Sequence, residues 1–193
     1  MSFIDFLIGI NRDFKGGNLF ALIDYISYFK YDLSLKPFGT WVNFYEYCRF
    51  YSTLNYKNKV VVDYGADIGS SAIYFLSKGA KQVIGIEIDK KAVDTSKKLS
   101  FNEFNFKIKF TYTLKKHPKG DILKMDIEGA EKDILTEEYL KGFKQFVIGL
   151  HPHAYSVYTF NTLENLLIRH GGKKYGMVKN ESNTESEIIY IKK

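Results

Sequence analysis

The sequence predicts an α/β protein with a doubly wound, mostly parallel sheet, and three features of the chain carry this prediction. A run of β-branched residues, Val60 to Val62, is typical of a strand buried on both faces of a parallel sheet. Gly65 and Gly69 follow this run and bracket a tight loop, after which a helical pattern begins at Ser70. A second apolar strand covers Val83 to Ile86. Strand, glycine turn, helix and second strand form the unit from which parallel sheets are built.

The composition fits a globular protein of 193 residues with a substantial core. Hydrophobic residues make up 45% of the chain and charged residues 26%, which is ordinary for a soluble protein. The single cysteine, Cys48, excludes an internal disulfide and is interpreted as a small core residue. We find no apolar run long enough to span a membrane, so we expect a cytoplasmic protein without membrane contact. The sequence does not indicate an oligomeric state.

The part of the chain before the first core strand is predicted to be helical. Apolar residues recur at helical spacing in three segments, 3–10, 19–29 and 41–51, which are separated by glycine and proline turns. We therefore divide the chain into an N-terminal helical extension, residues 1–56, and a core, residues 57–193.

The loop after the first strand has the chemistry of a ligand site. Glycines let a ligand approach the backbone, and the start of the following helix favours an anionic group such as a carboxylate. Asp63 and Asp67 add acceptors at the same rim. Glu87 ends the second strand, 87 − 69 = 18 residues after Gly69, where a carboxylate typically accepts from ribose hydroxyls, at a spacing of about 20 residues. The acid thus indicates a nucleoside ligand. The loop lacks the middle glycine of G-x-G-x-x-G, so a dinucleotide is not expected.

The pattern Asp63-x-Gly65-x-x-x-Gly69 resembles the first motif of the class I S-adenosylmethionine-dependent methyltransferases, which have a Rossmann-like fold. The resemblance implies S-adenosylmethionine as cofactor, with its methionine part at the loop and its ribose at Glu87. The residues it assigns to cofactor binding are Asp63, Tyr64, Gly65, Ala66, Asp67, Gly69, Glu87, Ile88 and Asp126. In such enzymes N-terminal helices commonly cover the cofactor, which is one interpretation of residues 1–56; packing against the sheet edge is the other. The alternative for the loop is a plain α/β turn whose acid caps the next helix.

A second motif follows the predicted strand Ile122 to Met125. The sequence D-x-E-G-A-E, from Asp126 to Glu131, resembles the signature of the FkbM-type methyltransferases, which implies O-methylation of a hydroxyl. Such a reaction needs a base, and the candidate catalytic residues at strand ends are Asp126, Glu128 and His151. The alternatives are that Asp126 only binds loop amides and that Glu128 caps the next helix. Glu131 is expected to be a solvated acid in the first turn of that helix.

The remaining elements complete the expected fold. They are a helix over 90–102, strands over 104–112 and 146–151, a helix and turn over 163–172, and an antiparallel strand pair, 175–178 and 188–191, at one sheet edge. The interval between the third and fourth strands is short, so the helix usual there is reduced or missing. We expect the adenine contact near Tyr112 and Thr113.

Three functions remain open at this point. The first is methyl transfer to a small molecule or sugar. The second is an RNA or DNA methyltransferase, in which the lysines behind the net charge of +6 would hold phosphates. The third is a catalytically inactive module that binds the cofactor. His151-Pro152-His153 with the two acids is also a possible metal site, but H-x-H without a third spaced ligand is a weak signal, and we predict no metal.

Overall fold

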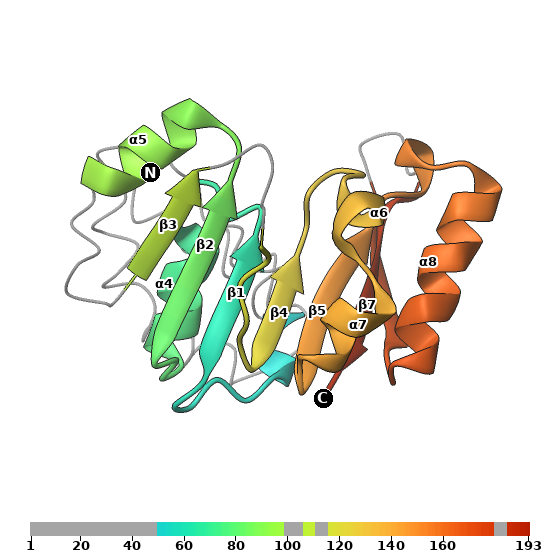
Figure 1. Ribbon diagram of the computed structural model, residues 1–193, viewed down its shortest axis with the longest axis horizontal. Helices are drawn as coiled ribbons and strands as arrows, with labels where there is room; N and C mark the ends of the chain where they lie inside the picture. Colours follow the sequence, from blue (N-terminus) through green and yellow to red (C-terminus); the bar gives the residue numbers. More distant parts are fainter. Residues whose placement is uncertain (1–49, 99–105, 111–115, 180–184) are drawn as a thin grey trace, which may run out of the picture.

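The computed structural model describes residues 50–98, 106–110, 116–179 and 185–193 (Figure 1). Its centre is a seven-stranded sheet in the order β3-β2-β1-β4-β5-β7-β6. The strands are β1 (Val60–Tyr64), β2 (Gln82–Glu87), β3 (Phe106–Phe110), β4 (Ile122–Met125), β5 (Gln145–Leu150), β6 (Lys173–Lys179) and β7 (Glu185–Lys192). The first five are parallel, and β7 pairs antiparallel with both β5 and β6. This confirms the predicted doubly wound, mostly parallel sheet with an antiparallel pair at one edge.

Helices cover both faces of this sheet (Figure 1). The helical elements within the described residues are η2 (Tyr51–Thr53), α4 (Ser70–Ser77), α5 (Lys90–Lys98), α6 (Glu131–Ile134), α7 (Glu137–Lys141), η4 (Pro152–Ala154) and α8 (Val157–Arg169). None of them is long and apolar enough to cross a membrane. The predicted helices over 3–10 and 19–29, most of that over 41–51, and the adenine candidates Tyr112 and Thr113 lie outside the described residues.

Strand alternation divides the core into two layers. In β1, Val61 packs with Ile73 and Phe75 of α4, whereas Val62 packs with residues of α7 and α8, such as Leu140 and Leu167. Successive side chains of a strand point to opposite faces, so an unbroken apolar run is buried twice. The β-branched run therefore specifies a central strand, as the sequence predicted.

Two elements differ from the sequence prediction. The short helix α7 was not predicted, and α8 begins at Val157, six residues before the predicted start at Leu163. Ser156 caps α8 by accepting from the backbone N–H of Thr159. Val157 and Tyr158 are apolar but 78% and 82% exposed, so the first turn of α8 does not show the helical spacing of buried residues.

The parallel strands end at one edge of the sheet and place four segments there. Gly65, Ile88, Asp126 and His151 each follow directly after β1, β2, β4 or β5. We call this the carboxyl edge, and it is the place where open α/β sheets bind ligands.

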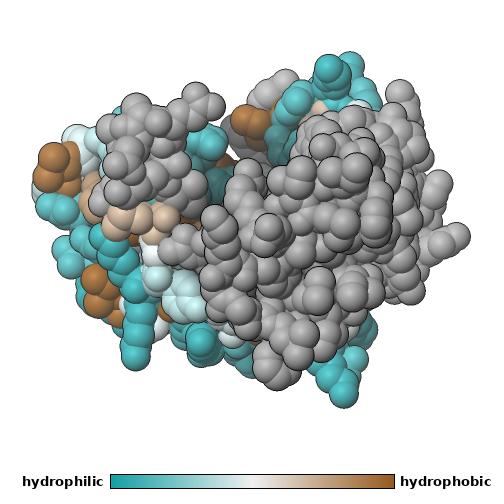
Figure 2. All heavy atoms as spheres, turned by 180° about the vertical axis from the view of Figure 1, so that it is seen from behind, coloured by the Kyte–Doolittle hydropathy of each residue, from teal (hydrophilic) through white to brown (hydrophobic). Residues whose placement is uncertain are grey.

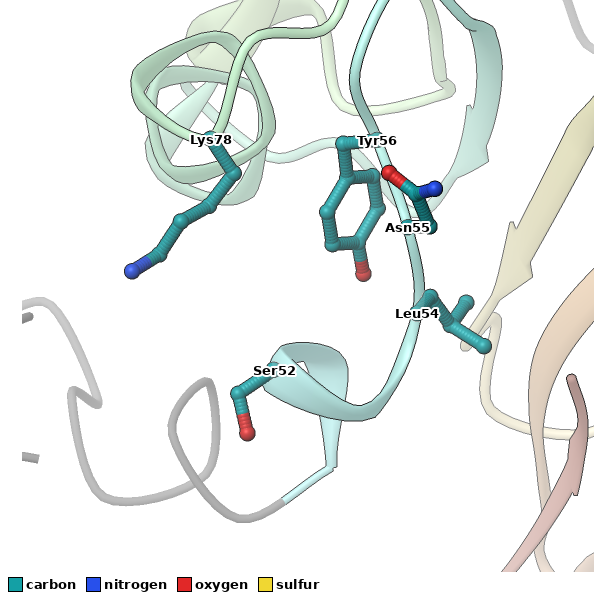
Figure 3. A pocket seen from close by; sticks show the side chains of 5 residues that line it. All are labelled: Ser52, Leu54, Asn55, Tyr56 and Lys78. Carbon is teal, nitrogen blue, oxygen red and sulfur yellow. The ribbon is translucent and has the colours of Figure 1, made fainter. Parts of the chain in front are cut away.

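A small pocket lies at the opposite end of the sheet, before β1 and after α4. Figure 3 shows the five side chains that line it: Ser52, Leu54, Asn55, Tyr56 and Lys78. None of these residues was predicted to be functional. Seen from behind, the described surface mixes hydrophilic and hydrophobic residues (Figure 2).

Candidate active site

The glycine loop packs directly on the segment that follows β4. The backbone N–H groups of Gly65 and Ala66 donate to the carbonyl of Ile86, at 3.0 and 3.2 Å. Gly65 has a φ of +73°, and a Cβ added there would lie 1.9 Å from the carbonyl oxygen of Asp126. Only glycine tolerates both conditions. Gly65 thus lets the loop pack on the D-x-E-G segment. This is a second reason for glycine here, besides the close approach of a ligand that the sequence predicted.

Glu87 holds the loop from the neighbouring strand. Its Oε2 accepts from the N–H of Asp67 at 2.8 Å, and its Oε1 accepts from Ile88 and Asp89 at 2.7 and 2.8 Å. Asp67 is exposed and has a φ of +46°, so the loop turns sharply where Glu87 holds it. A carboxylate has about four acceptor sites, and these three bonds leave Oε2 with capacity for a ligand hydroxyl. Ile88, the next residue, is 58% exposed.

Asp63 lies beneath the loop. Its side chain is fully buried, accepts from the hydroxyl of Ser71 at 2.5 Å and pairs with Lys124 at 3.1 Å. Lys124 also donates to the carbonyls of Tyr64 and Gly65, at 3.1 and 2.8 Å. Burial raises the pKa of Asp63, although Lys124 and Ser71 oppose the shift. The observed contacts of Asp63 are with protein groups, and its direct contact with a ligand stays a prediction.

Tyr64 directs its side chain to the other face of the sheet. Its hydroxyl lies 2.8 Å from Nδ1 of His117 and 3.3 Å from the hydroxyl of Tyr139, which donates to the carbonyl of Pro118 at 3.0 Å. Only the backbone of Tyr64 therefore adjoins the loop. The residues of this aromatic cluster are far apart in sequence, and sequence reasoning missed it. Ala66 is buried within the loop, and Gly69 begins α4 with a φ of +103°.

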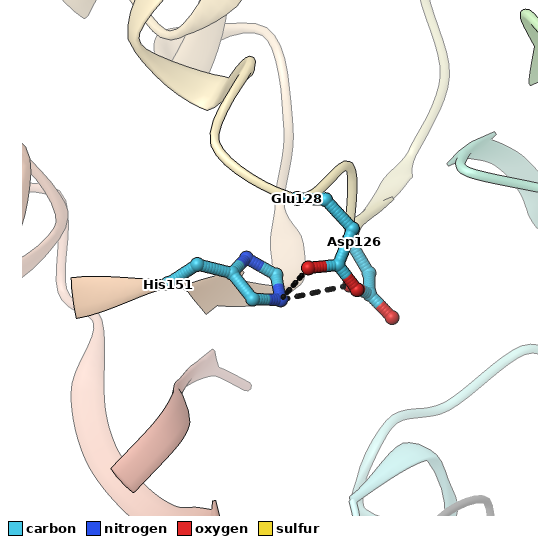
Figure 4. Close-up of side chains that lie close together, drawn as sticks. All are labelled: Asp126, Glu128 and His151. Atoms are coloured by element: carbon cyan, nitrogen blue, oxygen red, sulfur yellow. Dashed lines mark ion pairs between the residues drawn. The ribbon is translucent and has the colours of Figure 1, made fainter. Parts of the chain in front are cut away.

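The three predicted catalytic residues meet at the carboxyl edge (Figure 4). Nε2 of His151 lies 3.5 Å from Oδ1 of Asp126 and 3.4 Å from Oε2 of Glu128. The His151 side chain is 4% exposed, that of Asp126 29% and that of Glu128 77%. The acids therefore lie between the buried imidazole and solvent. His153 is exposed and lies outside this group, its ring centre 5.9 Å from that of His151.

The backbone of the D-x-E-G segment has an unusual shape that aims these acids. Glu128 has a φ of +53° and Gly129 a φ of +103°. A Cβ added at Gly129 would lie 2.5 Å from Cβ of Ala154 in η4. The glycine therefore lets the segment after β4 pack against the segment after β5, which brings Glu128 to His151.

Glu131 corrects a sequence prediction, because it is completely buried rather than solvated. Its carboxylate accepts from the N–H groups of Ile127 and Gly129, at 3.0 and 2.9 Å, and from the hydroxyl of Tyr155. Its Oε1 lies 3.4 Å from Nδ1 of His151. Burial raises the pKa of Glu131, but these hydrogen bonds outweigh it, and the net pKa is lowered. The ionised carboxylate of Glu131 thus holds both the D-x-E-G segment and the imidazole of His151 in place.

His151 is surrounded by carboxylates. Burial of the imidazole lowers its pKa, but Glu131, Asp126 and Glu128 outweigh burial and raise the pKa to about 9. Glu187 of β7 acts in the same direction. A Cβ added at Gly149 would lie 1.7 Å from Oε1 of Glu187, so Gly149 makes room for this buried acid. The sequence pattern did not reveal Glu187, because β7 begins 185 − 150 = 35 residues after β5 ends. In the sheet, however, β7 lies directly beside β5.

Two viral proteins resemble this chain. It is 40% identical over 105 residues to Uncharacterized protein 158B of Sulfolobus islandicus rod-shaped virus 1, a match that covers 52% of this chain and 66% of the viral protein. It is 33% identical over 117 residues to Uncharacterized protein 65 of Sulfolobus islandicus filamentous virus, which covers 55% of this chain and 68% of that protein. A shorter match, 44% identical over 45 residues, is to the ribosomal protein L11 methyltransferase of Hamiltonella defensa and covers 23% of this chain and 15% of that enzyme.

Solved structures with this fold include several methyltransferases. A putative RNA methyltransferase from Pyrococcus horikoshii superimposes with a TM-score of 0.54 at 23% identity, covering 73% of this chain and 78% of that one. Magnesium protoporphyrin IX methyltransferase from Synechocystis, with bound S-adenosylmethionine, gives a TM-score of 0.52 at 14% identity and 74% coverage of both chains. The fold is therefore that of the class I methyltransferases. No model of a known protein family matches the chain, so its assignment to the FkbM branch stays a prediction.

Proposed function

We propose that this chain, which belongs to the same family as Uncharacterized protein 65 of Sulfolobus islandicus filamentous virus, is an S-adenosylmethionine-dependent methyltransferase. The proposal is supported by its class I methyltransferase fold. The acceptor we propose is a hydroxyl of a small molecule or sugar. One observation carries the proposal: Gly65 of the glycine loop packs on the carbonyl of Asp126. That contact sets a cofactor loop beside a cluster of acids at the carboxyl edge.

The cofactor would be held by residues of β1, β2 and the loops that follow them. The glycine loop would bind the methionine part, and Glu87 would accept from a ribose hydroxyl through the remaining capacity of Oε2. The exposed side chain of Ile88 offers apolar surface to the adenine ring. Bound S-adenosylmethionine would supply an electrophilic methyl group on a positively charged sulfur.

The acids after β4 would serve the acceptor. Methyl transfer is an in-line displacement in which the sulfur–carbon bond breaks as the oxygen–carbon bond forms, and the hydroxyl proton passes to a base. Asp126 and Glu128 are the carboxylates that reach solvent at this place. His151 lies behind them, within 3.5 Å of both, and orients them. We assign proton acceptance to the carboxylates and positioning to His151.

The assignment is tested by titration calorimetry with S-adenosylmethionine and S-adenosylhomocysteine, with NAD as a negative control. We expect binding of the first two ligands by the wild-type protein. Glu87→Ala should weaken S-adenosylmethionine by roughly 10- to 100-fold, because a hydrogen bond to a charged group contributes about 1.5–3 kcal/mol. Glu138→Ala removes an exposed acid of α7 and is the matched control.

Two results would contradict this assignment. Equal affinity in Glu87→Ala and wild type would restrict Glu87 to holding the loop backbone. Absence of binding by both sulfur ligands would remove the cofactor assignment altogether, and with it the proposed reaction.

A nucleic-acid acceptor is the second candidate, favoured by the net charge of +6 and by the putative RNA methyltransferase among the similar structures. Contacts with phosphates release counterions, so such binding weakens steeply as salt is raised. RNA affinity that falls at least tenfold between 50 and 200 mM salt, together with methylation of that RNA, would favour this acceptor over a small hydroxylated molecule. An inactive module would instead bind the cofactor without consuming it. Its function would then be unchanged by Asp126→Asn and Glu128→Gln.

A further inference from the structure

The side chains of Asp126, Glu128 and His151 converge on one point (Figure 4). One ligand atom from each residue, two carboxylate oxygens and an imidazole nitrogen, lies within 4.8 Å of the others. From this geometry we propose that these three residues form a binding site for a divalent metal ion of the Mn²⁺ type. This revises the sequence prediction, in which His151 and His153 were considered together with the two acids and no metal was expected.

The distances suit a metal ion. Mn²⁺ favours octahedral coordination, in which neighbouring ligand atoms about 2.2 Å from the metal lie about 3.1 Å apart. Nε2 of His151 lies 3.4 Å from the Glu128 oxygen and 3.5 Å from the Asp126 oxygen. Carboxylate oxygens combined with one imidazole suit a first-row divalent ion better than Ca²⁺, which prefers six to eight oxygens. Three protein ligands also leave positions open for water or an acceptor, as in catalytic metal sites.

A second observation, made at the other ring nitrogen of His151, points the same way. Glu131, completely buried, places Oε1 3.4 Å from Nδ1 of His151, on the side of the ring away from the acids. Metal-binding histidines are commonly oriented by a carboxylate at the ring nitrogen that does not bind the metal. With Nδ1 facing Glu131, the other nitrogen is directed toward Asp126 and Glu128.

The charge around the imidazole also favours a bound cation. Asp126, Glu128 and Glu131 lie within 3.5 Å of its nitrogens, and Glu187 is buried nearby. Lys124, another buried basic residue, pairs with Asp63 and donates to the carbonyls of Tyr64 and Gly65. A divalent ion between Asp126 and Glu128 would balance carboxylates that otherwise repel one another.

The metal would position the acceptor hydroxyl next to the methyl donor and favour its deprotonation. This use rests on the proposed methyltransferase function, whereas metal binding itself does not. The two are separable because the metal can be titrated without S-adenosylmethionine, and the cofactor can be titrated without metal.

The test uses Mn²⁺ as the probe and the full-length protein, stripped with a chelator and dialysed. Free Mn²⁺ is followed by electron paramagnetic resonance while the protein is titrated. We expect one site per chain, weakened at least about tenfold by Glu128→Gln, since exposed Glu128 can lose its charge without disturbing the core. Asp126→Asn should act likewise. Glu138→Gln changes the same charge on the exposed face of α7 and should bind Mn²⁺ as wild type does.

Two outcomes would overturn the proposal: no Mn²⁺ site in wild type, or a site of equal affinity in wild type and both variants. Circular dichroism of each variant establishes that it is folded before its titration is interpreted. Cofactor calorimetry on the same metal-free samples keeps the two proposals apart. If S-adenosylmethionine and S-adenosylhomocysteine bind but Mn²⁺ does not, the metal site is rejected and the methyltransferase proposal stands.

Discussion

At the scale of single residues, the buried pair of Lys124 and Asp63 explains how the glycine loop keeps its shape. Lys124 contacts Asp63 and two loop carbonyls at once, and the two side chains are 5% and 0% exposed. Removing one partner of a buried pair leaves an uncompensated charge and costs about 3–5 kcal/mol. We therefore expect Lys124→Met to lower the free energy of unfolding by about this amount, measured by urea unfolding at pH 7.

A second substitution separates charge from packing. The double variant Lys124→Met, Asp63→Asn removes both charges, so it should be more stable than Lys124→Met alone. If the two variants unfold at the same urea concentration, the loss comes from the carbonyl contacts of Lys124 and not from the uncompensated buried charge of Asp63.

Residues of this site differ in how far sequence predicts them. Gly65, Asp126 and His151 were predicted because each follows an apolar strand, and parallel strands end at one edge. Glu131 was placed in solvent because its local pattern is that of a first-turn acid. Its burial depends on Tyr155 and His151, at least 20 residues away in sequence, and no local pattern contains that information.

At the scale of elements, Asp121 ties together the beginnings of three strands. Its Oδ2 accepts from the N–H of Val60 at 3.1 Å, and its carbonyl accepts from Lys144 and Gln145, at 3.0 and 3.3 Å. The bond from Val60 is the largest cause that lowers the pKa of Asp121. A carboxyl with a lowered pKa contributes stability above its unfolded pKa of about 3.9, and this contribution is lost as the pH falls through the lower folded value.

The prediction at this scale concerns that acidic range. Asp121→Asn should lower the free energy of unfolding by about 0.5–1.5 kcal/mol at pH 7, because a neutral amide oxygen accepts from Val60 more weakly than the charged carboxylate. Below about pH 4 the difference from wild type should shrink. Thermal unfolding from pH 7 to pH 2.5 measures it, with Asp94→Asn on the exposed face of α5 as control. A difference that stays constant over the whole range would show that the charge of Asp121 is not involved.

Strands could be predicted where their buried apolar residues form a visible pattern in the sequence. The run Val60–Val62 specified β1, and the apolar residues of 188–191 specified the middle of β7. The helix α6 was expected as the one that follows Glu128, whereas α7 was missed because five residues are too few to show a helical period. The D-x-E-G segment between β4 and α6 takes its shape from the packing of Gly129 on Ala154. These two residues follow different strands, so no local pattern predicts the contact.

At the scale of the whole molecule, the two core layers are joined through a single sheet. Val61 and Val62, adjacent in β1, belong to different layers, so neither layer can lose its packing without exposing the strand that both share. A domain built in this way is expected to unfold in one cooperative transition. The proposed cofactor contacts loops after β1 and β2, which both layers support.

Ligand binding should therefore stabilise the protein as a unit. At a concentration 100 times its dissociation constant, S-adenosylmethionine contributes about 2.7 kcal/mol. For a chain of this size, each kcal/mol raises Tm by about 2–4 °C, so we expect a shift of about 5–10 °C in scanning calorimetry. NAD should leave Tm unchanged, and Glu87→Ala should need a higher cofactor concentration for the same shift. If the ligand moves only one of two transitions, residues 1–56 and the core unfold separately, because a cooperative sheet would transmit the stabilisation to the entire molecule.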